Sequence, residues 1–158
     1  MMAAGEFAPA RQNLEIALST SSEWIGDHDL YAMLVDVAVR QRDESDIRKY
    51  AAQAEALATR YGHELYQAIV HRAWGVAHRL GGDNAAAKAS LNLALEIFTQ
   101  LKTRWQMGRT LFELGELAVT QANTAEAADF FSRAIELFEE MQATSDVLRT
   151  QAALDALK

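Results

Sequence analysis

Cysteine is absent from the 158-residue sequence, so a disulfide, a thiolate metal site and a catalytic thiol are all excluded. Proline occurs once and glycine eight times, which leaves long stretches that a helix can occupy without interruption. No apolar run approaches the roughly 20 residues that span a bilayer. The first residues also lack the basic start and long apolar core of a signal peptide. We therefore expect a cytoplasmic chain that does not enter a membrane.

Positive charge is also in short supply, because 15 Lys and Arg face 22 Asp and Glu and leave a net charge of −7. Nucleic-acid binding draws much of its affinity from a basic face that neutralises phosphates, so we expect no nucleic-acid partner. Half of the residues are hydrophobic and 23% are charged, as in folded proteins and unlike disordered acidic chains. The length and composition predict one domain over residues 1–158.

An internal repeat with a period of 40 residues organises the chain. Its apolar positions are Ala87, Leu91, Ala94, Leu95, Phe98 and Leu101 in one unit, and Ala127, Phe131, Ala134, Ile135, Phe138 and Met141 in the next. This spacing places all six side chains on one stripe of an α-helix. A weaker copy lies one period earlier, and a further half unit precedes it. Each repeat is therefore predicted to contain this helix and a second periodic helix before it.

Helix-end signals divide the chain into segments. Asp43, Asp83 and Asn123 stand where N-cap residues are expected, and Gly26 and Gly62 stand where a left-handed residue would end a helix. We predict helices over residues 8–23, 28–41, 44–60, 64–80, 84–101, 104–121, 124–141 and 145–157.

Two glycines occur at the same mid-helix register, Gly75 and Gly115. A glycine inside a helix costs about 1 kcal/mol relative to alanine, so its recurrence predicts a packing reason. Together with the alanines of the following helix, these glycines predict a close approach of the two helix axes.

The triplet Gly75, Ala87, Ala94 and its copy Gly115, Ala127, Ala134 resemble the tetratricopeptide repeat, and the resemblance covers roughly residues 5–158. It implies an all-α fold, a right-handed α-solenoid of antiparallel helix hairpins. The implied units are a half repeat at 5–26, repeats at 27–62, 63–102 and 103–143, and a capping helix at 144–158.

The repeat departs from the family pattern in its length, 40 residues in place of the usual 34, and in lacking the closing proline. Both departures imply longer helices, similar to the repeats of bacterial signalling proteins, where such arrays follow the ATPase module of transcription activators or nucleotide cyclases. We hypothesise that the chain is a piece of a larger protein of this kind.

Catalytic signatures are missing. The sequence contains no phosphate-binding loop and no nucleophile elbow, and His63-Glu64 lacks the second histidine of a helical zinc-protease motif, because Gln67 stands in its place. His71 and His78 share a helix face with Trp74 and could bind a transition metal, but they also fit ordinary packing positions of the repeat. We expect no enzymatic activity, no metal and no cofactor.

The concave side is the predicted binding surface, because the resemblance places the first helix of each repeat there. Its register gives the groove residues Ile69, Arg72, Val76, Arg79, Arg109, Phe112, Glu116 and Val119. Apolar anchors beside arginines suit an amphipathic or extended peptide that bears carboxylates. A merely solvated concave face is the alternative. The lysine and asparagine that some family members use to clamp a terminal carboxylate are replaced here, for example by Ala32 and Asp36, so that specificity is not expected.

The sequence therefore predicts a non-enzymatic scaffold that binds a protein or peptide. Two alternatives stay open at this point: a sensor domain for a small ligand or metal, and a self-association module that uses an exposed apolar face of the first helix.

Overall fold

The computed structural model describes residues 7–20 and 27–158, and these residues form eight α-helices and no β-strand. The helices are α1 (Phe7–Thr20), α2 (Asp27–Gln41), α3 (Glu44–Tyr61), α4 (Glu64–Leu80), α5 (Asn84–Gln100), α6 (Arg104–Thr120), α7 (Thr124–Glu140) and α8 (Thr144–Asp155). Every predicted helix is present, with bounds within two residues of the prediction from α2 onward. The predicted end of the first helix at residue 23, and Gly26, lie outside the described residues.

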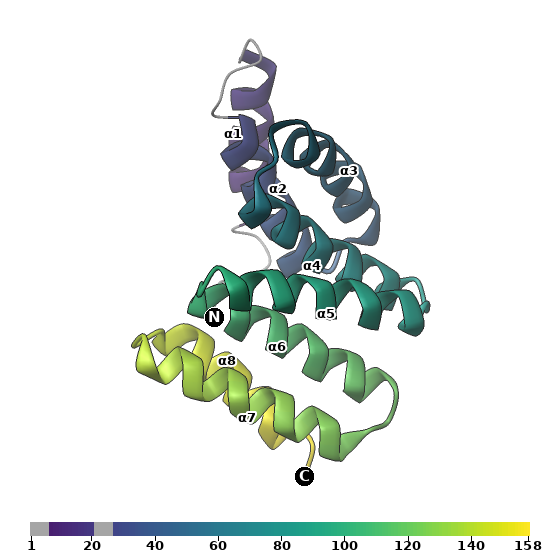
Figure 1. Cartoon of the computed structure of the whole chain (residues 1–158), viewed down its shortest axis with the longest axis vertical. Coiled ribbons are helices and arrows are strands. Elements are labelled where there is room, and N and C mark those ends of the chain that lie inside the picture. The colour runs from purple at the N-terminus through teal and green to yellow at the C-terminus, as the bar shows by residue number, and fades with distance from the viewer. Residues whose placement is uncertain (1–6, 21–26) are drawn as a thin grey trace.

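Consecutive helices pack against each other in chain order, from α1, α2 and α3 at one end to α7 and α8 at the other (Figure 1). The tightest pairs are α4 with α5 and α6 with α7, the two hairpins of the strongest sequence repeats. Helix α2 also contacts α4, and α4 contacts α6, so the first helices of successive hairpins form one continuous layer. The expected all-α solenoid of helix hairpins is confirmed.

The three predicted N-caps are confirmed. The side-chain oxygens of Asp43, Asp83 and Asn123 accept hydrogen bonds from backbone N–H groups three residues further on, at 3.0, 3.0 and 3.2 Å. Each bond satisfies one of the donors that the first turn of a helix leaves free.

A left-handed residue directly precedes the N-cap in the turns from α2 onward. Glycine fills this position at Gly62, as predicted, and at Gly82. Four other residue types also adopt it, with φ between 55° and 57°: Arg42, Lys102, Ala122 and Gln142. Such residues disfavour this conformation by roughly 1–2 kcal/mol, which explains why the sequence pattern does not reveal them. The packing of the helices on either side determines these turns.

The two repeated glycines lie at close helix contacts, as predicted. A Cβ at Gly75 would come within 2.5 Å of Leu91 Cγ, and a Cβ at Gly115 within 2.4 Å of Phe131 Cε1. A third contact of this kind was not predicted: a Cβ at Gly108 would lie 2.7 Å from Phe138 Cε1. Large side chains of the second helix in each hairpin thus fill the space that the missing side chains leave.

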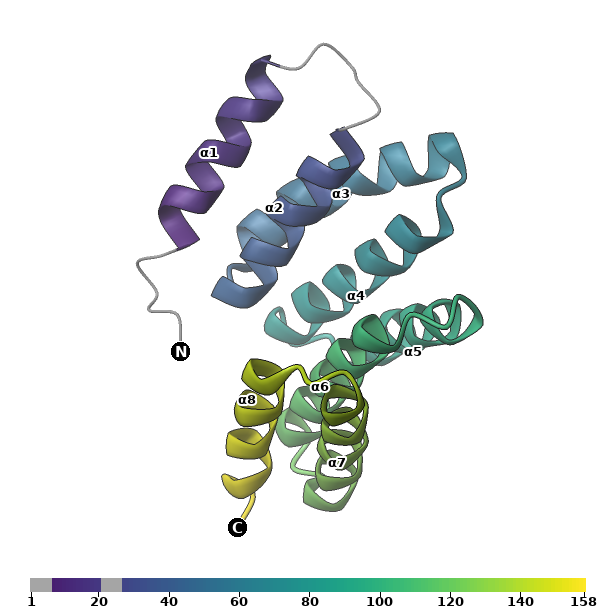
Figure 2. The same cartoon turned by 90° about the vertical axis from the view of Figure 1, so that its left-hand side faces the viewer.

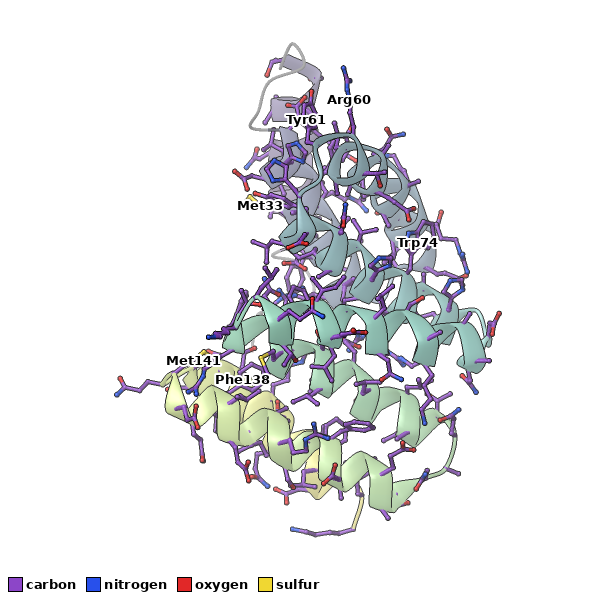
Figure 3. The ribbon with its side chains drawn as sticks, viewed as in Figure 1. Met33, Arg60, Tyr61, Trp74, Phe138 and Met141 are labelled. Atoms are coloured by element: carbon purple, nitrogen blue, oxygen red, sulfur yellow. The ribbon has the colours of Figure 1, made fainter. Side chains whose placement is uncertain are left out.

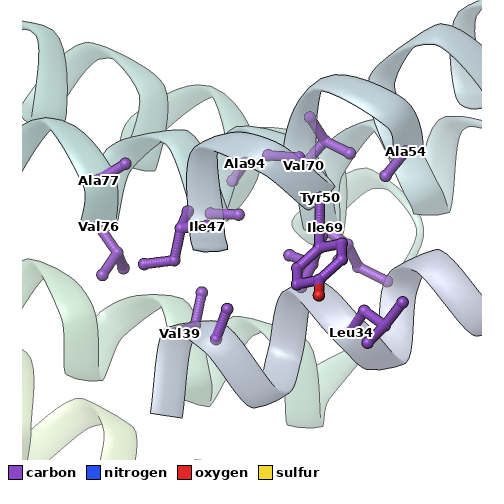
Figure 4. Close-up of a cluster of buried hydrophobic side chains, with 14 of the residues drawn as sticks. Leu34, Val39, Ile47, Tyr50, Ala54, Ile69, Val70, Val76, Ala77 and Ala94 are labelled. Carbon is purple, nitrogen blue, oxygen red and sulfur yellow. The ribbon is translucent and has the colours of Figure 1, made fainter. Parts of the chain in front are cut away.

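The largest core cluster joins α2, α3 and α4, and it is closed by two residues of α5 (Figure 4). Helix α1 packs on this cluster through Leu14 and Leu18, whereas its Ile16 is 54% exposed. Arg11 of α1 also forms an ion pair with Asp46. Part of the apolar surface of the first helix is therefore covered within the chain, and self-association through the rest stays a prediction.

Candidate functional site

The apolar residues predicted to line the groove are mostly buried. Ile69 and Val76 are 6% and 0% exposed and belong to the core between α2 and α4, so they are not surface anchors as expected. The reason is that neighbouring α2 covers this face of α4. Phe112 is also buried, against Phe131, whereas Val119 is 45% exposed.

Two of the predicted groove arginines share one carboxylate. Arg109 binds Asp36 with both guanidinium ends, at 2.9 and 3.0 Å. Arg72 is 1% exposed and donates to Asp36 at 3.3 Å and to the side-chain oxygen of Gln106 at 2.6 Å. These bonds join α2, α4 and α6 on the inner layer. The guanidiniums of Arg72 and Arg109 are therefore largely occupied within the chain.

A second carboxylate, Glu113 of α6, is shared by three arginines: Arg42 from the turn between α2 and α3, Arg79 from α4 and Arg149 from α8. Arg42 donates to both of its oxygens, at 2.8 and 2.9 Å. Arg79 lies 3.5 Å from one oxygen, and Arg149 lies 4.0 Å from the other. The Nε and Nη2 atoms of Arg79 are buried and have no hydrogen-bond partner among the described residues. One buried negative charge thus faces three positive ones.

Some of these residues line a hollow that we name the arginine cleft. It is lined by Val39 and Arg40 of α2, Arg72 of α4, Arg109, Phe112 and Glu113 of α6, Phe138 of α7, and Asp146, Arg149 and Thr150 of α8. Seen from the side, the C-terminal end of α2 lies above the N-terminal end of α8 (Figure 2), and both ends contribute to the cleft. The curvature of the solenoid therefore brings together residues more than 100 positions apart in the sequence.

The sequence of the central helices identifies the family. Residues 66–140, which cover most of α4 and all of α5 to α7, match the model of the tetratricopeptide repeat. The chain therefore contains tetratricopeptide repeats. No curated protein matches the sequence significantly. Repeats of this family generally mediate protein–protein interactions and are typically non-catalytic.

In this tetratricopeptide repeat array, the pKa values of the buried charged groups depend on the balance between burial and ion pairing. Burial raises the pKa of Asp36, but the charges of Arg109 and Arg72 outweigh it and hold that pKa below its ordinary value. Glu113 behaves in the same way because of Arg42, Arg79 and Arg149. Burial, followed by repulsion from Arg109, lowers the pKa of Arg72 to about 9. All of these groups are consequently charged at neutral pH.

The histidines considered as metal ligands lie elsewhere. Trp74, between His71 and His78 in the sequence, lies on the opposite side of the ribbon from Met33 (Figure 3), and it donates to Glu55 at 3.1 Å. The rings of Trp74 and His78 are 6.2 Å apart. Within residues 7–20 and 27–158, no group of three or more histidine and acidic side chains is arranged to hold a metal ion. None of the described helices is long and apolar enough to cross a membrane.

Another histidine, His28 at the start of α2, predicts how the stability of the fold depends on pH. It is 7% exposed and packs against the rings of Tyr61 and His63, at 5.1 and 4.8 Å. Burial, followed by the charge of His63, lowers the pKa of His28 from its ordinary 6.5, and burial also lowers that of His71. Below about pH 6.5 the unfolded chain therefore binds more protons than the folded chain.

We expect the free energy of unfolding to fall as the pH drops from 7.5 to 5.5, measured by urea denaturation at each pH. The stabilisation due to neutral His28 is fully present above pH 6.5 and is lost as the pH falls toward the lower folded-state pKa. His28→Gln should show a smaller decrease over the same interval. An identical pH dependence in both proteins would contradict this assignment.

Sequence reasoning missed four of the charged residues in and around the arginine cleft: Arg40, Arg42, Glu113 and Arg149. A signal was available for Glu113, because a charged residue within the apolar series of α6 needs a buried partner. For the arginines no local signal exists, since their positions next to the cleft depend on how far the solenoid curves between α2 and α8.

Proposed function

We propose that this tetratricopeptide repeat protein is a scaffold that binds a segment of a partner protein on the face formed by α2, α4, α6 and α8, with the arginine cleft as the anchoring point. The main support for this proposal is the positive charge of the arginine cleft. Of the described residues, four arginines and two acidic residues line the cleft, in a chain with a net charge of −7. A local positive surface of this kind favours an acidic segment.

Exposed apolar side chains on α2 and α6, two of the helices that line the arginine cleft, support a peptide rather than a bare ion as the ligand. Met33 of α2 is 54% exposed, and its spacing to Asp36 and Arg40 places it on the helix face that turns toward the cleft. Val119 of α6, 45% exposed, lies one turn beyond Glu116. A segment with alternating acidic and apolar residues would match both features.

Peptide selection tests the proposal directly. Random dodecapeptides displayed on phage are selected on the purified protein, and the affinity of the enriched peptides is measured by fluorescence anisotropy. Hydrogen exchange then locates the bound peptide. We expect acidic peptides that protect amides of α2, α6 and α8. Failure to enrich any peptide, or protection restricted to α3, α5 and α7, would overturn the proposal.

A further inference from the structure

The arginines of the cleft differ in how fully their charge is compensated. Arg109 and Arg42 each hold a carboxylate with two hydrogen bonds, to Asp36 and Glu113 respectively. Arg40 lines the same cleft and is exposed, and it forms no ion pair within the part of the chain that the structure describes. Its guanidinium keeps all five donors available.

Arg149 is the second arginine with unused donors. Its side chain is 39% exposed, and its one ion pair among the described residues is the 4.0 Å contact with Glu113, a carboxylate that Arg42 already holds at 2.8 Å. The guanidinium lies 4.0 Å above the ring of Phe112. This stacking fixes its position while its N–H edge stays free.

Arg40 and Arg149 come from opposite sides of the arginine cleft, from the end of α2 and the first turns of α8. The positive charges of Arg40, Arg42 and Arg109 act unfavourably on Arg149 and contribute to lowering its pKa, after the larger effect of burial. An anion placed between Arg40 and Arg149 would relieve this repulsion and accept hydrogen bonds from both guanidiniums.

We propose that Arg40 and Arg149 clamp one carboxylate of an acidic peptide side chain in the arginine cleft. The proposal rests on the proposed peptide-binding function and refines it. It assigns anion binding to Arg40 and Arg149, which are not among the groove residues predicted from the repeat register. Arg72 and Arg109, which were predicted to line the groove, instead stabilise the cleft by binding Asp36.

The test uses N-acetylglutamate α-amide, which carries a single carboxylate, with N-acetylglutamine α-amide as its uncharged twin and inorganic phosphate as a competing oxyanion. Binding is followed through the side-chain Nε–H resonances of the arginines by NMR. We expect a saturable shift at Arg40 and Arg149 with the carboxylate probe and none with the amide. Exposed Arg60 and Arg133, which do not line the cleft, serve as internal references.

Arg40→Gln and Arg149→Gln should each lower the affinity for the carboxylate probe at least about tenfold, whereas Arg60→Gln should leave that affinity unchanged. Arg40 makes no ion pair among the described residues, so Arg40→Gln should keep the wild-type melting temperature, which separates loss of binding from loss of folding. Equal shifts at all arginines, no saturation, or tighter saturation by phosphate than by the carboxylate would overturn the proposal.

The two proposals fail in different ways. If selected peptides bind and Arg40→Gln leaves their affinity unchanged, the proposal that Arg40 and Arg149 bind a carboxylate is wrong, and the proposed scaffold function is unaffected. If no peptide is selected, the scaffold function is wrong, and the titration with N-acetylglutamate α-amide still decides whether the cleft binds a carboxylate.

Discussion

Glu113→Gln is expected to lower the free energy of unfolding by about 3 kcal/mol, because removing one member of a buried ionic cluster leaves the opposite charges uncompensated. The side chain of Glu113 is 5% exposed and faces Arg42, Arg79 and Arg149. Glutamine has nearly the same size, so packing is preserved and the charge alone is removed. The loss lies at the lower end of the usual range because Arg42 and Arg149 keep some contact with water.

Chemical denaturation with urea measures this loss, and Glu140→Gln is the matched control. Glu140 pairs with Arg104 on the surface, and both side chains are more than half exposed. Exposed pairs contribute less than about 1 kcal/mol, so the control should unfold almost as the wild-type protein does. Equal losses in the two variants would show that Glu113 does not hold the arginines together.

Gly115→Ala is expected to lower the free energy of unfolding by about 2 kcal/mol, because the cost of overpacking exceeds the gain in helix propensity. The added Cβ would lie 2.4 Å from the ring of Phe131, which is completely buried and cannot move aside without disturbing α7. The effect is therefore opposite in sign to the usual stabilisation of a helix by alanine.

The background variant Phe131→Ala isolates this contact. With the ring removed, Gly115→Ala should become neutral or stabilising by up to about 1 kcal/mol, a coupling that urea denaturation of the four proteins of a double-mutant cycle measures. If the two substitutions lower the free energy of unfolding additively, the destabilisation by Gly115→Ala does not come from contact with Phe131.

The helices and their ends could be predicted because their signals are local. The N-cap role of Asp43, Asp83 and Asn123 depends on three or four neighbouring residues, and the apolar stripe on a single helix. The contact of Gly108 with Phe138 could also have been inferred, since one period earlier the same register holds buried Ala68. A small residue recurring at one register indicates a close approach even when it is not always glycine.

The candidate site was predicted less well, for a reason that concerns distance along the chain. Arg72 and Arg109 were predicted to line the groove, whereas in the structure both bind Asp36, which lies 36 and 73 residues away in the sequence. Which of these side chains ends buried and paired depends on the rotation between successive hairpins, a quantity that accumulates along the array and has no local signature. The exposed ends of Arg40 and Arg149 follow from the same rotation.

The bonds from Arg109 to Asp36 and from Arg42 to Glu113 each connect the first hairpin to the third. In an ordinary repeat array each unit contacts its neighbours only, and the ends can fray while the middle persists. Here a truncation that removes α2 and α3 would also strip partners from α6. The array should therefore melt as a single cooperative unit, and shortening it from either terminus should weaken segments well beyond the cut.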